Sequence, residues 1–235
     1  MPIDIDRVHA LCFDVDGTLS DTDDLWVSRL HKFLSPIHAI FPGSDLRALA
    51  RRVIMEAESP GNMAYELLDR LHLDNAAART LQFIRRKDHG AAANYWLIPQ
   101  ADLALQVLKE RYPLAVVSAR GRLSTLAFLE QFHLLPHFRV VITGQTCRYT
   151  KPFPDPILAA AASMSVRPDE CLMIGDTTVD IHAGRAAGAQ TVGVLCGFGT
   201  ETELRRAGAD LILPGPFSLL DILLTPKKVD DSPGA

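Results

Sequence analysis

The chain has 235 residues, of which 48% are hydrophobic and 22% are charged. These values are ordinary for a globular protein, and they exclude a disordered chain, a collagen-like repeat and a disulfide-rich scaffold. The 24 Lys and Arg residues against 28 Asp and Glu residues give a net charge of −4. Nucleic acids and anionic membranes require clustered positive charge, so we expect neither of them as a partner.

Export and membrane insertion are also not indicated. No apolar run approaches the roughly 18 residues that span a bilayer. Asp4 and Asp6 stand where an export signal would have its basic and apolar segments. The four cysteines are widely spaced without a CxxC pair, so we expect neither a zinc site nor a disulfide framework. The sequence therefore predicts a cytoplasmic protein.

Six short apolar runs predict strands that are buried on both faces. Helical apolar patterns follow the second, third and fourth of these runs. Such alternation indicates an α/β fold with a parallel sheet flanked by helices. The predicted strands are 8–13, 114–117, 140–143, 171–174, 191–195 and 211–213, and the helical patterns are 123–129, 157–162 and 181–187.

One long stretch departs from the alternation. Residues 20–96 contain several helical patterns and no convincing strand, and they are too many for an ordinary connection. We therefore predict a core domain of residues 1–19 and 97–225, an inserted helical domain of residues 20–96, and a flexible tail of residues 226–235. A basic cluster in the insert could contact an anionic substrate or form a solvated helix face; it comprises Arg85, Arg86, Lys87 and His89.

Three signals mark helix boundaries. Asp155 before Pro156 has the character of an N-cap followed by proline in the first turn. Thr200 and Glu203 have capping-box spacing. Gly188 stands where a helix is expected to end before the next strand.

The segment from Asp14 to Leu19 is the first candidate site. It follows the first predicted strand directly, and residues two apart in an extended chain point the same way, so the Asp14 and Asp16 carboxylates can converge. Gly17 then permits a sharp turn. Two such carboxylates require a divalent cation or a shared proton, and Mg²⁺ suits an all-oxygen site. The alternative is an Asp-rich turn that caps backbone N–H groups.

Three further features also follow predicted strands, at the edge where open parallel sheets bind ligands. Ser118 could bind a phosphoryl oxygen or simply occupy a turn, and Arg120 is either an oxyanion clamp or a solvated charge. Lys151 lies in a loop stiffened by three prolines and could face a cluster of anions, or it is an exposed lysine. Asp176 ends a strand, and Asp180 lies four residues later, either at the site or as an acidic residue favoured by a helix N-terminus.

Together these residues resemble the four motifs of the haloacid dehalogenase superfamily, over about residues 8–213. The segment from Asp14 to Thr18 matches the first motif, Ser118 the second, Lys151 the third, and Asp176 with Asp180 the fourth. The insert is similar to the helical cap of the phosphoglycolate phosphatase and β-phosphoglucomutase branch. The resemblance implies a Rossmann-like core with Mg²⁺ at the tip of the sheet.

The resemblance also implies roles for individual residues. Asp14 would be the nucleophile that takes the phosphoryl group, and Asp16 the acid that protonates the leaving alcohol and then the base for water. Mg²⁺ would be held by Asp14, the Asp16 backbone carbonyl, Asp176 and Asp180. Lys151 would be catalytic, and the substrate-binding residues would be Thr18, Ser118, Ala119 and Arg120.

The function implied is a Mg²⁺-dependent phosphatase for a small phosphorylated metabolite. Asp16 favours a phosphatase or mutase over a dehalogenase, because a C–Cl bond breaks without protonation of the leaving group. The alternatives are a phosphomutase of the β-phosphoglucomutase type, which shares every core residue, and a non-catalytic module resembling a response-regulator receiver. The oligomeric state is not indicated by the sequence.

Overall fold

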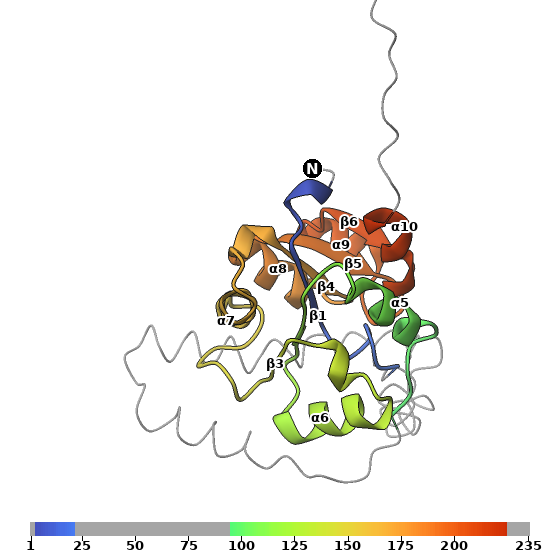
Figure 1. The fold of residues 1–235 in the computed structure, drawn as a ribbon. Coiled ribbons are helices and arrows are strands. Elements are labelled where there is room, and N and C mark those ends of the chain that lie inside the picture. The colour runs from blue at the N-terminus through green and yellow to red at the C-terminus, as the bar shows by residue number, and fades with distance from the viewer. Residues whose placement is uncertain (1–2, 22–94, 225–235) are drawn as a thin grey trace, which may run out of the picture.

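The computed structural model describes residues 3–21 and 95–224. Within them lies a parallel sheet of six strands in the order β3-β2-β1-β4-β5-β6, with helices on both faces (Figure 1). The predicted α/β, Rossmann-like fold is therefore confirmed. The strands are β1 (Ala10–Phe13), β2 (Leu114–Val117), β3 (Val140–Ile142), β4 (Cys171–Gly175), β5 (Gln190–Val194) and β6 (Leu211–Leu213).

Each predicted strand overlaps one observed strand, and the ends differ by up to two residues. The largest difference is at the start of β1, which begins at Ala10 rather than at Val8. A 3-10 turn precedes it, and the Val8 N–H closes that turn on the Ile5 carbonyl at 3.0 Å. The 3-10 turns are η1 (Ile5–Arg7), η3 (Leu135–His137), η4 (Pro168–Glu170) and η5 (Pro216–Ser218).

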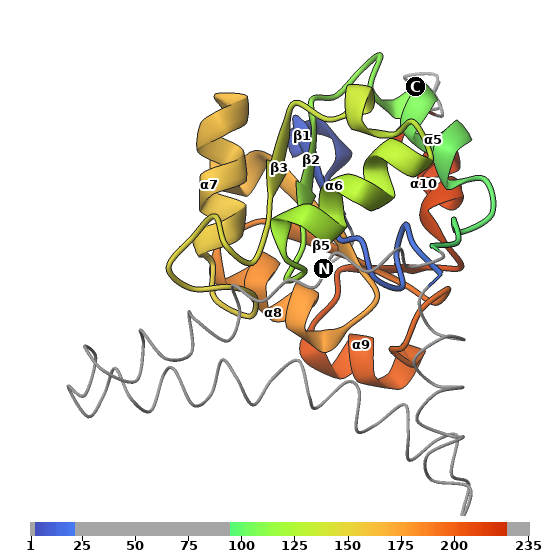
Figure 2. The same ribbon diagram turned by 90° about the horizontal axis from the view of Figure 1, so that it is seen from below.

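Alternating strand residues supply the two sides of the core. In β1, Leu11 and Phe13 pack on one face, and Ala10 and Cys12 pack on the other. The first face is covered by α5 (Ala101–Leu108), α6 (Arg122–Gln131) and α10 (Leu219–Leu223). The second is covered by α7 (Asp155–Met164), α8 (Thr178–Ala186) and α9 (Glu201–Ala207). Figure 2 shows these two helix layers with the sheet between them.

Two of the three predicted helix boundaries hold. Thr200 caps α9, where its N–H donates to Glu203 at 3.0 Å, and Gly188 follows α8 with a positive φ of 83°. The third is confirmed for Pro156 in the first turn, but its N-cap was wrong by one residue, because Asp155 is the first residue of α7 and Pro154 is its N-cap. Pro154 already has helical angles, and its carbonyl accepts the first two helical hydrogen bonds.

The chain leaves and re-enters the core at one place. The Asp21 N–H donates to the Trp96 carbonyl at 2.8 Å, and the Ile98 N–H donates to the Leu19 carbonyl at 2.9 Å. The residues on either side of the long connection are therefore hydrogen-bonded to each other, as expected when a segment is inserted between β1 and β2. The predicted helical domain with its basic cluster, and the predicted tail, lie almost entirely outside the described residues. None of the described helices is long and apolar enough to cross a bilayer.

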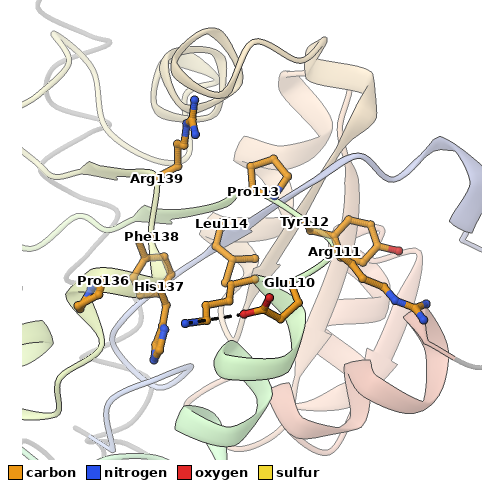
Figure 3. A pocket seen from close by; sticks show the side chains of 10 residues that line it. Glu110, Arg111, Tyr112, Pro113, Leu114, Pro136, His137, Phe138 and Arg139 are labelled. Atoms are coloured by element: carbon orange, nitrogen blue, oxygen red, sulfur yellow. Dashed lines mark ion pairs between the residues drawn. The ribbon is translucent and has the colours of Figure 1, made fainter.

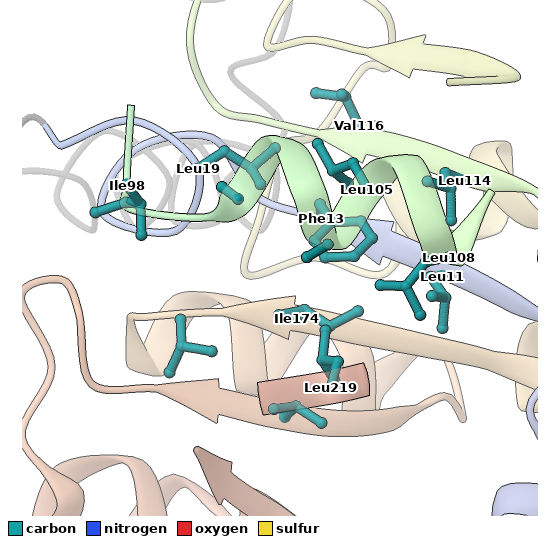
Figure 4. Packing of buried hydrophobic residues seen from close by; sticks show 14 of the residues in the cluster. Leu11, Phe13, Leu19, Ile98, Leu105, Leu108, Leu114, Val116, Ile174 and Leu219 are labelled. Atoms are coloured by element: carbon teal, nitrogen blue, oxygen red, sulfur yellow. The ribbon is translucent and has the colours of Figure 1, made fainter. Parts of the chain in front are cut away.

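Substitution of Leu105 by Ala on α5 tests the first side of the core. Leu105 is fully buried among strand residues (Figure 4), whereas Leu103 on the same helix is 49% exposed. We expect Leu105→Ala to lower the free energy of unfolding by about 2–5 kcal/mol. The matched Leu103→Ala variant is expected to stay within about 1 kcal/mol of wild type. Urea unfolding measures both, and equal losses would contradict this packing.

Candidate active site

The site residues lie at the carboxyl edge of the sheet, between its two central strands. Chain order runs outward from β1 to β3 on one side and from β4 to β6 on the other. This reversal is the switch point at which open α/β sheets bind ligands. Asp14 follows β1 and Asp176 follows β4, and the Asp14 N–H extends the pairing by donating to the Ile174 carbonyl at 2.9 Å.

Three carboxylates gather at this point. One oxygen from each of Asp14, Asp176 and Asp180 lies within 4.8 Å of the others, and all three residues are buried. Buried carboxylates repel one another strongly unless cations neutralise them. An all-oxygen cluster of this size fits a hard divalent cation.

Lys151 supplies one positive charge to this cluster. Its Nζ lies 2.6 Å from Asp14 Oδ1 and 2.5 Å from Asp180 Oδ1, and the residue is 2% exposed. Lys151 lies in the loop between β3 and α7, so the ammonium links the segments that follow three different strands. Three carboxylates and one ammonium leave two negative charges in the group, which matches the charge of a divalent cation.

Asp176 is fixed from two sides. Its carboxylate accepts hydrogen bonds from the Thr18 hydroxyl at 3.1 Å and from the Phe198 N–H at 2.8 Å. Gly17 has a φ of 74°, and a Cβ at either Gly17 or Gly197 would collide with this carboxylate. The two glycines therefore allow the loops after β1 and β5 to close around Asp176. The Thr18 hydroxyl, predicted to bind substrate, points to Asp176.

Asp180 serves both the helix and the site. It is the third residue of α8, and its Oδ2 accepts hydrogen bonds from the N–H and the hydroxyl of Thr177 at 3.0 and 2.7 Å. Its other oxygen faces Lys151. The sequence left two interpretations of Asp180 open, an acidic residue at a helix N-terminus and a residue of the site. The contacts of Asp180 agree with both.

Asp16 lies apart from the three-carboxylate cluster and is bound to Arg120. Nε of Arg120 donates to Asp16 Oδ2 at 3.1 Å, and Nη2 donates to Asp16 Oδ1. Tyr95 and Phe128 lie behind the guanidinium, with ring centroids 5.1 and 5.9 Å from its Cζ. Burial by itself would lower the pKa of Arg120, but the charge and hydrogen bonds of Asp16 raise it above its usual value. Asp14 and Asp16 are therefore neutralised by different cations.

Ser118 begins the loop that carries Arg120. Ser118 is 4% exposed, and its Oγ accepts a hydrogen bond from the Arg120 N–H at 3.1 Å. The Arg120 carbonyl accepts one from the Gly144 N–H at 3.0 Å. Gly144 lies against the Ala119 carbonyl, where a Cβ would collide with it. The loop from Ser118 to Arg120 is therefore held firmly against the segment after β3.

Several residues that support the site were not among those predicted from the sequence. Thr177 could have been found, because its spacing from Asp180 is that of a capping box with an acidic third residue. Gly197, Phe198 and Tyr95 carry no local signal, since they reach the site only through the tertiary fold. The basic cluster predicted in residues 20–96 is outside the described residues.

A separate pocket of about 500 Å³ lies at the opposite edge of the sheet (Figure 3). It is lined by residues 109–114 and 136–139, which precede β2 and β3. Burial, and then the positive charge of Lys109, lower the pKa of His137 in this pocket. None of the predicted site residues lines it.

Comparisons with known proteins give consistent matches. The Pyrophosphatase PpaX of Anoxybacillus flavithermus is 28% identical over 218 residues, which cover 92% of this chain and 97% of that protein. The crystal structure of a hydrolase from Pseudomonas syringae has a TM-score of 0.64 and 27% identity, with 92% of this chain and 97% of that chain covered.

A haloacid dehalogenase family hydrolase from Deinococcus radiodurans, crystallised with bound phosphate and sodium, has a TM-score of 0.68. It is 22% identical, with 92% of this chain and 95% of that chain covered, so this likeness concerns the fold alone. The family model for haloacid dehalogenase-like hydrolases matches residues 11–194, which include every motif described above. The chain therefore belongs to the haloacid dehalogenase-like hydrolase family and is an enzyme of that family.

Proposed function

We propose that the protein is a Mg²⁺-dependent phosphatase that hydrolyses a small phosphorylated metabolite through an aspartyl-phosphate on Asp14. The observation that carries this proposal is the buried group formed by Asp14, Asp176, Asp180 and Lys151 at the switch point of the sheet. Phosphoryl transfer depends mainly on positioning and on charge neutralisation at several points. This group supplies both.

Asp14 has the properties required of the nucleophile. Its carboxylate is ion-paired to Lys151 at 2.6 Å, and its backbone is held by Ile174. An Asp14 oxygen would form a bond to phosphorus while the bond from phosphorus to the leaving oxygen breaks. Water would then attack the phosphorus of the acyl phosphate, and inorganic phosphate would leave. Two such steps replace one difficult displacement.

The donor set fits Mg²⁺. The carboxylates of Asp14, Asp176 and Asp180, with the backbone carbonyl of Asp16, would hold the ion. Hard oxygen ligands and a net negative charge favour Mg²⁺ over softer metals. When bound, the ion would neutralise charge on the phosphoryl oxygens.

The remaining site residues would act on the substrate. Ser118 and Lys151 would bind oxygens of the transferring group, together with the loop positions Thr18, Ala119 and Arg120. Asp16 would protonate a leaving alcohol and later take a proton from the attacking water. Its side chain is 23% exposed, more than that of Asp14, as expected for a group on the leaving side.

The alternative is a phosphomutase, because such an enzyme would use the same core residues and differ in the inserted domain. Isomerisation of a sugar phosphate without release of inorganic phosphate would favour it. The non-catalytic module has no support, since the family match is to hydrolases. We extend the proposal to a cytoplasmic enzyme, consistent with four free cysteines.

Replacement of Asp14 by Asn tests the nucleophile. We expect turnover of p-nitrophenyl phosphate to be abolished with the fold unchanged by circular dichroism, because the amide is nearly isosteric but cannot accept the phosphoryl group. Asp102→Asn, an exposed aspartate in the first turn of α5, is the matched control. Residual activity of Asp14→Asn above about a tenth of wild type would contradict the role.

Replacement of Asp16 by Asn tests the acid. We expect kcat/KM to fall by about 100-fold or more for ethyl phosphate but by less than about tenfold for p-nitrophenyl phosphate. The nitrophenolate leaves without a proton, whereas ethanol needs one. Steady-state kinetics on both esters give the comparison, and equal losses would refute an acid role.

The metal site is tested by thermal unfolding with and without Mg²⁺. A ligand at about 100 times its Kd stabilises the folded state by about 2.7 kcal/mol. For a protein of this size that is a rise in Tm of roughly 5–10 °C. We expect this rise in wild type and in the Asp102→Asn control, but not in Asp176→Asn. An unchanged Mg²⁺ effect in Asp176→Asn would contradict the assignment.

A further inference from the structure

Arg120 holds a position that the proposed chemistry does not yet explain. Its guanidinium binds both oxygens of Asp16, the residue proposed to face the leaving group. Its side chain is 12% exposed and that of Asp16 is 23% exposed, whereas Asp14 and Lys151 are more deeply buried. The Arg120 and Asp16 pair is therefore the more solvent-accessible of the two ion-paired groups at the site.

The surroundings of Arg120 hold its guanidinium in place, so that another anion could replace Asp16 as its partner. Its backbone is held through Ser118 and Gly144, and the rings of Tyr95 and Phe128 lie behind its guanidinium. Cations are attracted to aromatic faces, so the rings hold the guanidinium in place independently of Asp16. Nη1 is buried and has no hydrogen-bond partner among the described residues. The guanidinium thus retains unused donors.

A planar guanidinium binds carboxylate and phosphate oxygens with the same forked geometry. An anionic group of a substrate could therefore replace the Asp16 carboxylate on Arg120, and it could also use Nη1. Lys151 is paired with Asp14 and Asp180, on the side proposed to hold the transferring phosphoryl group. Of the two cations described at this site, Arg120 is the one bound to Asp16, the residue proposed to face the leaving group.

We propose that Arg120 selects substrates whose leaving group carries its own negative charge close to the bond that breaks. Arg120 binds that second anionic group and in doing so frees Asp16 from the ion pair, so that Asp16 can take up a proton from solvent and, where the leaving group is an alcohol, donate it to the leaving oxygen. A second phosphoryl group and a carboxylate share this chemistry, as in a phosphoanhydride and in a carboxylate-bearing phosphate ester. The inference rests on the proposed function, because it assigns the leaving-group side from Asp14 and Asp16.

Four substrates in two matched pairs test the selection. Pyrophosphate and p-nitrophenyl phosphate both have leaving groups that need no proton, and only the first has a second anionic group. 2-Phosphoglycolate and ethyl phosphate both release an alcohol, and only the first bears a carboxylate. In each pair, one substrate has a leaving group with a second anionic group and the other does not. In Arg120→Gln we expect kcat/KM to fall at least about tenfold further for the first kind of substrate than for the second, in one or both pairs. The substrate pair in which this difference appears shows whether Arg120 binds a second phosphoryl group or a carboxylate.

Two further variants separate the effect of the positive charge of Arg120 from that of its forked geometry and provide a control. Arg120→Lys keeps the charge without the forked geometry, and we expect it to restore only part of the discrimination. Arg122→Gln, on an exposed arginine at the start of α6, should change neither ratio. Calorimetry adds a readout without turnover: Arg120→Gln should weaken binding of methylenediphosphonate by about tenfold if the anhydride pair responds, and that of inorganic phosphate much less.

The outcomes distinguish this inference from the proposed function. Equal losses in Arg120→Gln on both members of both pairs would overturn the selection by Arg120 while leaving a working phosphatase. Preferential use of p-nitrophenyl phosphate and ethyl phosphate by the wild-type enzyme, over their partners in the two pairs, would overturn the selection as well. Failure of the wild-type enzyme to release phosphate from any of the four would instead contradict the proposed function.

Discussion

The contact on which the site depends is the buried ammonium of Lys151 between the carboxylates of Asp14 and Asp180. A charge with so little exposure requires partners, and each carboxylate would repel the other without the cation. The three residues follow β1, β3 and β4, so the pairing also fixes how the loops after these strands meet. The parallel sheet supplies the common edge, and the ion pairs at that edge set the positions of the groups that we propose to react.

A second pair, between Asp16 and Arg120, gives the two neighbouring aspartates different surroundings. Asp14 faces a deeply buried ammonium shared with Asp180, whereas Asp16 faces a guanidinium held against aromatic rings. Two carboxylates two residues apart can thereby perform different tasks. This separation agrees with a nucleophile on one side of a phosphoryl group and a proton donor on the other.

Much of this could be predicted from the sequence, because buried parallel strands leave strong local signals. Six apolar runs located the six strands, and the polar residues that follow them located Asp14, Lys151 and Asp176. Helix α5 received no prediction, although Ala101, Ala104, Leu105 and Leu108 have helical spacing. The contact of Arg120 with Asp16, and that of Phe198 with Asp176, could not be predicted, because they join segments 104 and 22 residues apart through the tertiary fold.

The proposed mechanism requires that Asp14 becomes covalently phosphorylated during turnover. The most direct measurement is rapid quenching of the enzyme with substrate and Mg²⁺, followed by borohydride reduction and mass spectrometry of the peptide that contains Asp14. We expect Asp14 to be recovered as homoserine, the reduction product of an aspartyl phosphate, in wild type, and no such product in Asp14→Asn. Release of phosphate at the normal rate with no modified Asp14 at any quench time would contradict it.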